Sequence, residues 1–78
     1  MEEIKMQQAA GSTVFEGRLN VDIYNTNGPL YHRRISAKRV VSEPGGMVWI
    51  IDEDDEITGY SANSIETMAI SLDVEDEQ

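Results

Sequence analysis

Apolar and polar residues alternate along residues 13–25, and this period of two is typical of a β-strand with one buried face. The apolar positions that share this face are Phe15, Leu19, Val21 and Ile23. Polar residues occupy most of the positions between them, so we expect the other face to meet water. Gly17 interrupts the pattern, and a bulge or a bend is predicted at this point.

Turn-forming residues divide the following sequence into four more predicted strands, at residues 30–41, 47–51, 57–61 and 65–72. The predicted turns between them lie at residues 25–29, 42–46, 52–56 and 62–64. Several of these turns contain glycine, proline or asparagine, which favour the backbone conformations that end a strand. The chain therefore alternates between short strands and tight turns.

Two of these strands have unusual patterns. Neither face of residues 30–41 is wholly apolar, so we expect this long strand to bend or to carry a bulge that swaps its faces. Residues 47–51 are a continuous apolar run that is too short for a helix between its flanking turns. This run is predicted to be the central and most buried strand, with Trp49 in the core.

The two ends of the chain have different patterns. Residues 2–10 are good helix formers with acidic residues in the first turn, and Gly11 follows as a stop signal. The sequence predicts a short N-terminal helix there, which needs to dock on the rest of the chain to be stable. Residues 73–78 form an acidic tail that we expect to be disordered, so residues 1–72 make up the single predicted domain.

Together these elements predict an all-β fold: a small five-stranded antiparallel SH3-like or Sm-like barrel with a short N-terminal helix. Five short strands joined by tight turns close most economically into a barrel. The chain has 78 residues and no cysteine, so its small core has no disulfide to support it. Association into a homo-oligomer is one way for such a domain to gain stability.

Localisation follows from the hydrophobic pattern. No apolar run reaches the ~18 residues of a membrane-spanning helix. The first residues are acidic, whereas a secretory signal begins with basic residues. We therefore expect a soluble, cytoplasmic protein.

The formal net charge of −9 is unevenly distributed along the chain. Residues 1–42 contain six basic and four acidic residues, a charge of +2, whereas residues 43–78 contain eleven acidic residues and no base, a charge of −11. Such asymmetry is typical of proteins with an electrostatic partner, and acidity also keeps a small domain soluble.

The first predicted strand ends in Val-Asp-Ile-Tyr-Asn-Thr-Asn-Gly at residues 21–28, and the last one opens with Ser-Ile-Glu-Thr at residues 64–67. With these segments, the predicted layout resembles the Sm-like family over residues 2–70. The resemblance implies a ring in which the fourth strand pairs with the fifth strand of the next subunit. The resemblance also implies an RNA-binding loop before the fifth strand, but residues 60–64 contain no basic residue. The resemblance therefore concerns the fold rather than the RNA chemistry.

The sequence offers little for catalysis or for metal binding. His32 is the only histidine, no cysteine is present, and no glycine-flanked nucleophile turn occurs. Acidic residues alternate within residues 52–56 as ligands of hard cations do, but Ile57 and Asn63 stand where an EF-hand loop needs glycine and glutamate. We therefore predict a protein that is not an enzyme and that has no metal site and no cofactor.

One binding hypothesis rests on the basic segment of the second predicted strand. Lys and Arg side chains track phosphates, and neighbouring aromatic rings stack on the bases of single-stranded nucleic acid. The residues of this nucleic-acid-binding hypothesis are Tyr31, His32, Arg33, Arg34, Lys38 and Arg39. Strand alternation divides these charges between two faces, and the net charge opposes the approach of a polyanion. The alternative interpretation is that these basic residues pair with the acidic half of the chain or lie in a contact between subunits.

The opposite hypothesis rests on the acidic half of the chain. Carboxylates spread over a rigid barrel imitate a phosphate backbone and occupy a basic site on a nucleic-acid-handling protein. The residues of this acidic surface are Asp52, Glu53, Asp54, Asp55, Glu56 and Glu66. Our first hypothesis is therefore a binding or inhibitor module that mimics nucleic acid, of the kind that phages and mobile elements use against host defence. A ring that binds single-stranded RNA or DNA and a structural subunit of a larger assembly are the alternatives.

Overall fold

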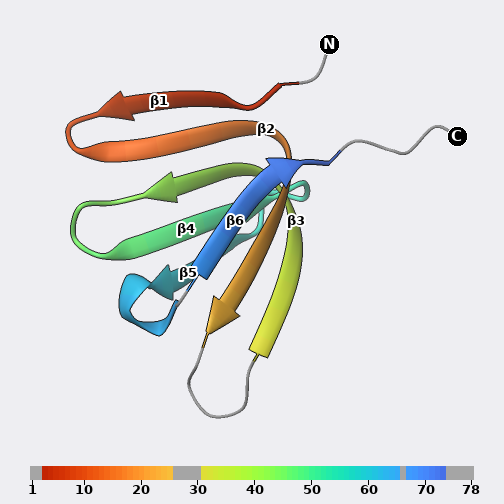
Figure 1. The fold of residues 1–78 in the computed structure, drawn as a ribbon. Helices are drawn as coiled ribbons and strands as arrows, with labels where there is room; N and C mark the ends of the chain where they lie inside the picture. The colour runs from red at the N-terminus through yellow and green to blue at the C-terminus, as the bar shows by residue number, and fades with distance from the viewer. Residues whose placement is uncertain (1–2, 26–30, 66, 74–78) are drawn as a thin grey trace, which may run out of the picture.

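The computed structural model describes residues 3–25, 31–65 and 67–73 of the chain. These residues form six antiparallel strands and one short 3-10 turn, η1, before the last strand (Figure 1). Their bounds are β1 Lys5–Ala9, β2 Ser12–Asn25, β3 Tyr31–Ser42, β4 Met47–Asp52, β5 Ile57–Ser61, η1 Ala62–Ser64 and β6 Thr67–Leu72. The fold is therefore all-β, as predicted, and the five predicted strands correspond to β2 through β6.

The strands form one sheet in the order β1-β2-β3-β4-β5, and β6 pairs with β2. The long β2 changes partner along one of its edges. Its first part pairs with β1 from Ser12 to Glu16, and its second part pairs with β6 from Leu19 to Tyr24. No ladder joins β5 to β6 within the described residues, so the predicted closure into a barrel is not seen there.

The sheet folds over on itself into two layers (Figure 1). We call the first the front layer, which contains β6, residues 19–25 of β2 and residues 31–37 of β3. We call the second the back layer, which contains β1, residues 12–16 of β2, residues 39–42 of β3, β4 and β5. Strands that pass from one layer to the other need a bulge at the corner.

Both corner strands have such an irregularity. The β2–β3 register shifts between Glu16 and Leu19, where Gly17 has a φ of +141°. The β3–β4 register shifts between Ala37 and Arg39. The first shift confirms the bend predicted at Gly17. The predicted face swap of the second strand is also confirmed, because Ala37 and Val40 are both buried although one is at an odd and the other at an even position.

The core lies between the two layers. Its buried residues are Leu19, Val21, Ile23, Ala37, Val40, Val48 and Ile50. Partly buried apolar residues from β2, β3, β5 and β6 pack around this cluster. The apolar face predicted for β2 therefore does form the centre of the core.

The predicted N-terminal helix is wrong, because Lys5–Ala9 form β1. A helix of this length is marginal by itself, and the backbone hydrogen bonds that β2 offers outweigh helix propensity. Ala10 and Gly11, with φ values of +55° and +85°, form the tight turn that reverses the chain into β2.

The predicted acidic tail lies mostly outside the described residues. Asp73 is described, and its N–H donates a hydrogen bond to the carbonyl oxygen of Arg18 at 2.8 Å. No helix in the described part of the chain is long and apolar enough to cross a membrane.

Candidate functional site

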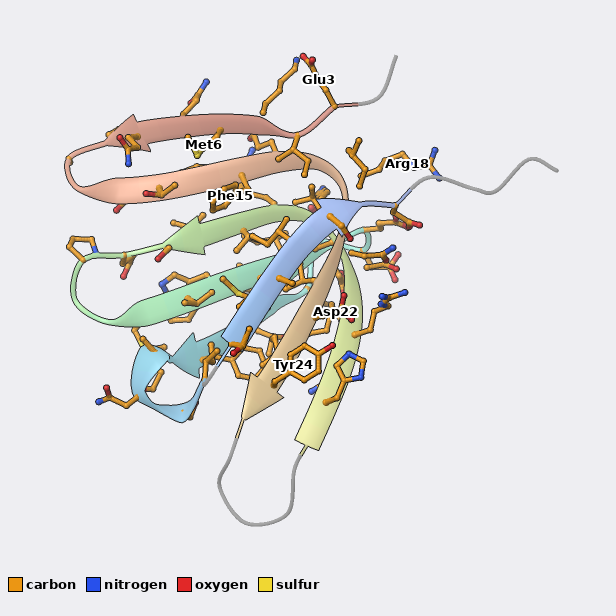
Figure 2. All side chains as sticks on the ribbon, viewed as in Figure 1. Glu3, Met6, Phe15, Arg18, Asp22 and Tyr24 are labelled. Carbon is orange, nitrogen blue, oxygen red and sulfur yellow. The ribbon has the colours of Figure 1, made fainter. Side chains whose placement is uncertain are left out.

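Two basic side chains of β3 converge on one carboxylate of β2 (Figure 2). Asp22 lies opposite Arg34 in the ladder and accepts two hydrogen bonds from its guanidinium, at 2.8 Å to Nε and 3.1 Å to Nη2. The Nε2 atom of His32 lies 2.8 Å from the same carboxylate. The side chain of Asp22 is only 9% exposed, whereas that of Arg34 is 60% exposed. One buried carboxylate therefore binds two exposed basic side chains.

These contacts influence the protonation of the Asp22 carboxyl group. The hydrogen bonds from Arg34, and then the single hydrogen bond with His32, lower the pKa of Asp22 from 3.8 to about 2, against the opposing effect of burial. The His32 ring also stacks on Tyr24, with ring centroids 4.5 Å apart and an interplanar angle of 12°. We call these four residues the Asp22 cluster; it ties β3 to β2 on the outer face of the front layer.

The basic side chains farther along β3 also have acidic partners. Arg39 lies opposite Glu16 in the ladder and donates to its carboxylate from Nε at 2.9 Å. Lys38, at the register shift of β3, pairs with Asp55 in the turn between β4 and β5. Of these two pairs, only Lys38–Asp55 joins the basic and acidic halves of the sequence.

Arg33 lies on the other side of the strand and donates to the hydroxyl of Tyr60 on β5 at 3.2 Å. The side chain of Tyr31 lies outside the described residues. The candidate nucleic-acid-binding residues therefore do not form one cationic patch. They are divided between the two sides of β3, and each described base contacts a carboxylate or a hydroxyl of its own chain.

The predicted acidic turn has a defined structure. The Asp52 carboxylate accepts hydrogen bonds from the N–H groups of Asp54 at 2.9 Å and Glu56 at 3.0 Å. The Asp52 N–H donates to the Glu56 carbonyl oxygen at 3.0 Å, which closes the turn. Asp55 has a φ of +68°, a conformation that Asp tolerates better than most residues. Asp52 thus holds the turn, and Asp55 faces Lys38.

Three acidic side chains of the turn remain at the surface. Glu53, Asp54 and Glu56 are exposed, and no described basic side chain pairs with their carboxylates. Glu66, the sixth residue of the predicted acidic surface, lies outside the described residues. Among the described residues no group of three or more acidic or histidine side chains is placed to hold a metal ion, and no pocket is found.

Sequence reasoning placed Trp49 in the core, and this is wrong. Val48 and Ile50 of β4 are buried in the core, whereas Trp49 is only half-buried and lies between them on the opposite face. Its indole ring lies against Gly59 of β5, the residue beside it in the ladder. Adjacent residues of a strand face opposite sides of the sheet, but residues 47–51 are all apolar, so their pattern does not indicate which side the core covers.

Comparison with known proteins found no matching family model, no matching curated protein and no matching solved structure. The geometry therefore stands alone in defining the class of protein. The described residues form a small all-β domain built on one folded antiparallel sheet, in which the basic side chains of β3 contact groups of their own chain and the acidic turn is exposed.

Proposed function

We propose that this chain is a non-enzymatic binding module whose exposed carboxylates engage a basic site on another protein. In its specific form, the domain mimics the phosphate backbone of a nucleic acid and blocks a nucleic-acid-handling protein, as inhibitors from phages and mobile elements do. The observation that carries the proposal is that, among the described residues, basic side chains have partners and several acidic ones do not. The basic side chains of β3 contact groups of their own chain, whereas the carboxylates of Glu53, Asp54 and Glu56 face water.

The rigidity of the acidic turn supports the same proposal. Asp52 fixes the turn through two hydrogen bonds to backbone N–H groups, and the Lys38–Asp55 pair attaches the turn to β3. Carboxylates held on a fixed frame lose less conformational entropy on binding than the same charges on a mobile tail. A strongly negative protein is also drawn quickly to a basic partner at low salt.

Affinity purification followed by competition tests this function. The tagged protein is incubated with lysate of its source or host cell, and half of the lysate is treated with nuclease. We expect a basic nucleic-acid-binding protein in both halves, and we expect this chain to displace nucleic acid from the purified partner. Recovery of nucleic acid, with the proteins lost after nuclease, would contradict the proposal.

A pair of matched variants separates the acidic turn from net charge. The double variant Glu53→Gln/Asp54→Asn removes two negative charges from the turn. The double variant Ser36→Lys/Ser71→Lys makes the net charge less negative by the same two units, but at exposed positions on the front layer. We expect the first to weaken binding by about threefold to tenfold and the second to have little effect. Equal effects of the two variants would show that the turn has no special role.

A second candidate function has a specific observation in its favour. Within the described residues, β5 pairs only with β4 and β6 pairs only with β2, so each presents one open edge. Open edges are templates for pairing with another chain. The strand order β6-β2-β3-β4-β5 also supports a fold related to SH3-like or Sm-like barrels, and with it a ring of subunits that binds single-stranded RNA or DNA.

Oligomeric state and salt dependence decide this second candidate. A ring predicts a stable oligomer by sedimentation and binding of single strands that weakens steeply with salt. A monomer that does not bind single strands at about 50 mM salt, where electrostatic attraction is strong, would eliminate it. A monomer that still binds a protein partner would also leave open the role of a structural subunit in a larger assembly.

A further inference from the structure

The back layer has an apolar surface on the side that faces away from the core. Val14, Val41 and Trp49 lie side by side on adjacent strands β2, β3 and β4. The next row continues with Ile51 and Ile57 on β4 and β5. These five residues alternate with residues that face the core, so they share the outer face of the sheet. We call them the outer apolar face.

The described elements leave this face open. The front layer, with β6, packs on the other side of the back layer, around the core cluster (Figure 1). Ile57 is 64% exposed, more than any other large apolar residue in the part of the chain that the structure describes. Val14, Val41, Trp49 and Ile51 are half-buried. Contiguous apolar residues at a surface mark sites where another molecule docks.

Trp49 and Gly59 give this face its centre. A Cβ atom on residue 59 would lie 2.4 Å from Cζ3 of the indole, so the ring occupies the space that a side chain would otherwise fill. The ring therefore lies against the backbone of Gly59 on the outer side of the sheet. Partly buried tryptophan side chains are frequent energetic centres of protein interfaces.

Charge at the rim indicates which kind of molecule fits. The acidic turn follows directly after Ile51 and leads into Ile57, and the exposed Glu43 lies in the turn before β4. Arg39, which shares the row with Ile51, is paired with Glu16, and Lys5 lies beyond Glu16 on β1. The apolar centre beside β4 and β5 is therefore bordered by carboxylates.

We propose that the outer apolar face is the docking surface for a protein partner that presents an apolar side chain surrounded by lysine or arginine. This inference rests on the proposed function and adds an apolar anchor to it. The apolar centre supplies affinity by excluding water, and the acidic rim selects a basic partner. A second copy of this chain fits poorly, because it would bring two acidic rims of like charge together.

The test uses Trp49 as its own reporter, since it is the only tryptophan of the chain. Three peptides of about ten residues, long enough to cross the back layer when extended, are titrated while the emission of Trp49 is recorded. One alternates arginine with leucine, the second arginine with serine, and the third glutamate with leucine. We expect the arginine–leucine peptide to bind with a change in emission and at least about tenfold more tightly than the other two.

Matched variants locate the site. Ile57→Asn removes the exposed apolar side chain of this face, and Met6→Asn removes an equally exposed one, 60% accessible, from β1 on the opposite side of the sheet. We expect Ile57→Asn to weaken the arginine–leucine peptide by about fivefold or more and to leave the arginine–serine peptide unchanged. Met6→Asn should change neither, and thermal unfolding of both variants confirms that they are folded.

The outcomes separate this inference from the function on which it rests. If both arginine peptides bind equally and only Glu53→Gln/Asp54→Asn weakens them, the acidic module stands and the apolar anchor is wrong. If neither arginine peptide binds, the acidic module itself is wrong. Equal binding of the glutamate–leucine peptide would overturn the charge selection. An emission change that depends on protein concentration without peptide, and that Ile57→Asn abolishes, would identify a second copy as the occupant and overturn the proposal.

Discussion

The carboxylate of Asp22 on β2 receives two hydrogen bonds from the guanidinium of Arg34, its cross-strand neighbour on β3. Asp22 is buried, whereas the side chain of Arg34 is 60% exposed. A buried carboxylate is costly unless it is paired, so this contact fixes the register of the β2–β3 hairpin as well as the charge of the residue.

Stability should therefore depend on the protonation of Asp22. Its pKa in the folded state is about 2, below its usual value of 3.8. The unfolded chain thus binds more protons at acidic pH, and the stabilisation from Asp22 is complete above pH 3.8 and is lost as the pH falls through about 2. Urea unfolding at a series of pH values from neutral to 2 measures this loss as a fall in the unfolding midpoint.

Asp22→Asn tests the assignment of this pH dependence. The variant should be less stable than the natural chain at neutral pH, and its stability should change less between pH 3.8 and 2. Glu16→Gln is the matched control, because Glu16 faces Arg39 across the same two strands but is 38% exposed. A larger loss in the control than in Asp22→Asn would show that burial does not decide the strength of these pairs.

Gly59→Ala should destabilise the back layer although alanine suits a strand better than glycine. Backbone entropy alone favours the variant by roughly 0.5–1 kcal/mol. The new Cβ, however, would lie 2.4 Å from the Trp49 ring, and displacing the indole costs about 1–3 kcal/mol. We expect a net loss of stability and a shift of Trp49 emission to longer wavelength. Gly45→Ala, where nothing lies within 4 Å, is the control and should leave the emission unchanged.

Gly17→Ala should weaken the corner at which β2 passes between the layers. The backbone there has a φ of +141°, and a Cβ would lie 2.8 Å from the carbonyl oxygen of Glu3. We expect a cost of about 1–3 kcal/mol in the free energy of unfolding, measured with urea. Gly46→Ala has a φ of +98° and open space around it, so it reports the backbone strain alone. Equal costs for the two variants would mean that the close approach to Glu3 is unimportant.

Asp52→Ala should loosen the acidic turn, because two N–H groups lose their acceptor. We expect a cost of about 1 kcal/mol in the free energy of unfolding, since both N–H groups are exposed and water replaces the carboxylate. Asp52→Asn keeps an oxygen acceptor and should restore most of this stability while removing the same charge. If Asp52→Asn were as unstable as Asp52→Ala, charge rather than hydrogen bonding would hold the turn.

Much of the fold was predictable from local pattern. The period-two alternation of Leu19, Val21 and Ile23 identified the buried face of β2, and glycine and proline placed the turns. Gly17 located the corner, because only glycine adopts its φ without strain. The acidic turn was recognisable in the same way, since Asp and Glu at residues 52–56 interrupt an apolar run.

The N-terminal segment shows where local pattern failed. Residues 5–9 have helix-forming side chains, but a short segment takes the structure that its neighbours offer, and the free edge of β2 offered a ladder. Trp49 shows a different failure. Its sequence neighbours are all apolar, so the sequence did not indicate which face of β4 the core would cover.

The sequence by itself determined strands β2 to β6, the turns between them and the separation of charge, because each depends on residues that are close together along the chain. Only the tertiary structure decided the rest. It paired Asp22 with Arg34 and Lys38 with Asp55, laid Trp49 over Gly59, and left an apolar face with an acidic rim. These relationships depend on strand register and on the fold of the sheet, which are set by packing between residues far apart in sequence.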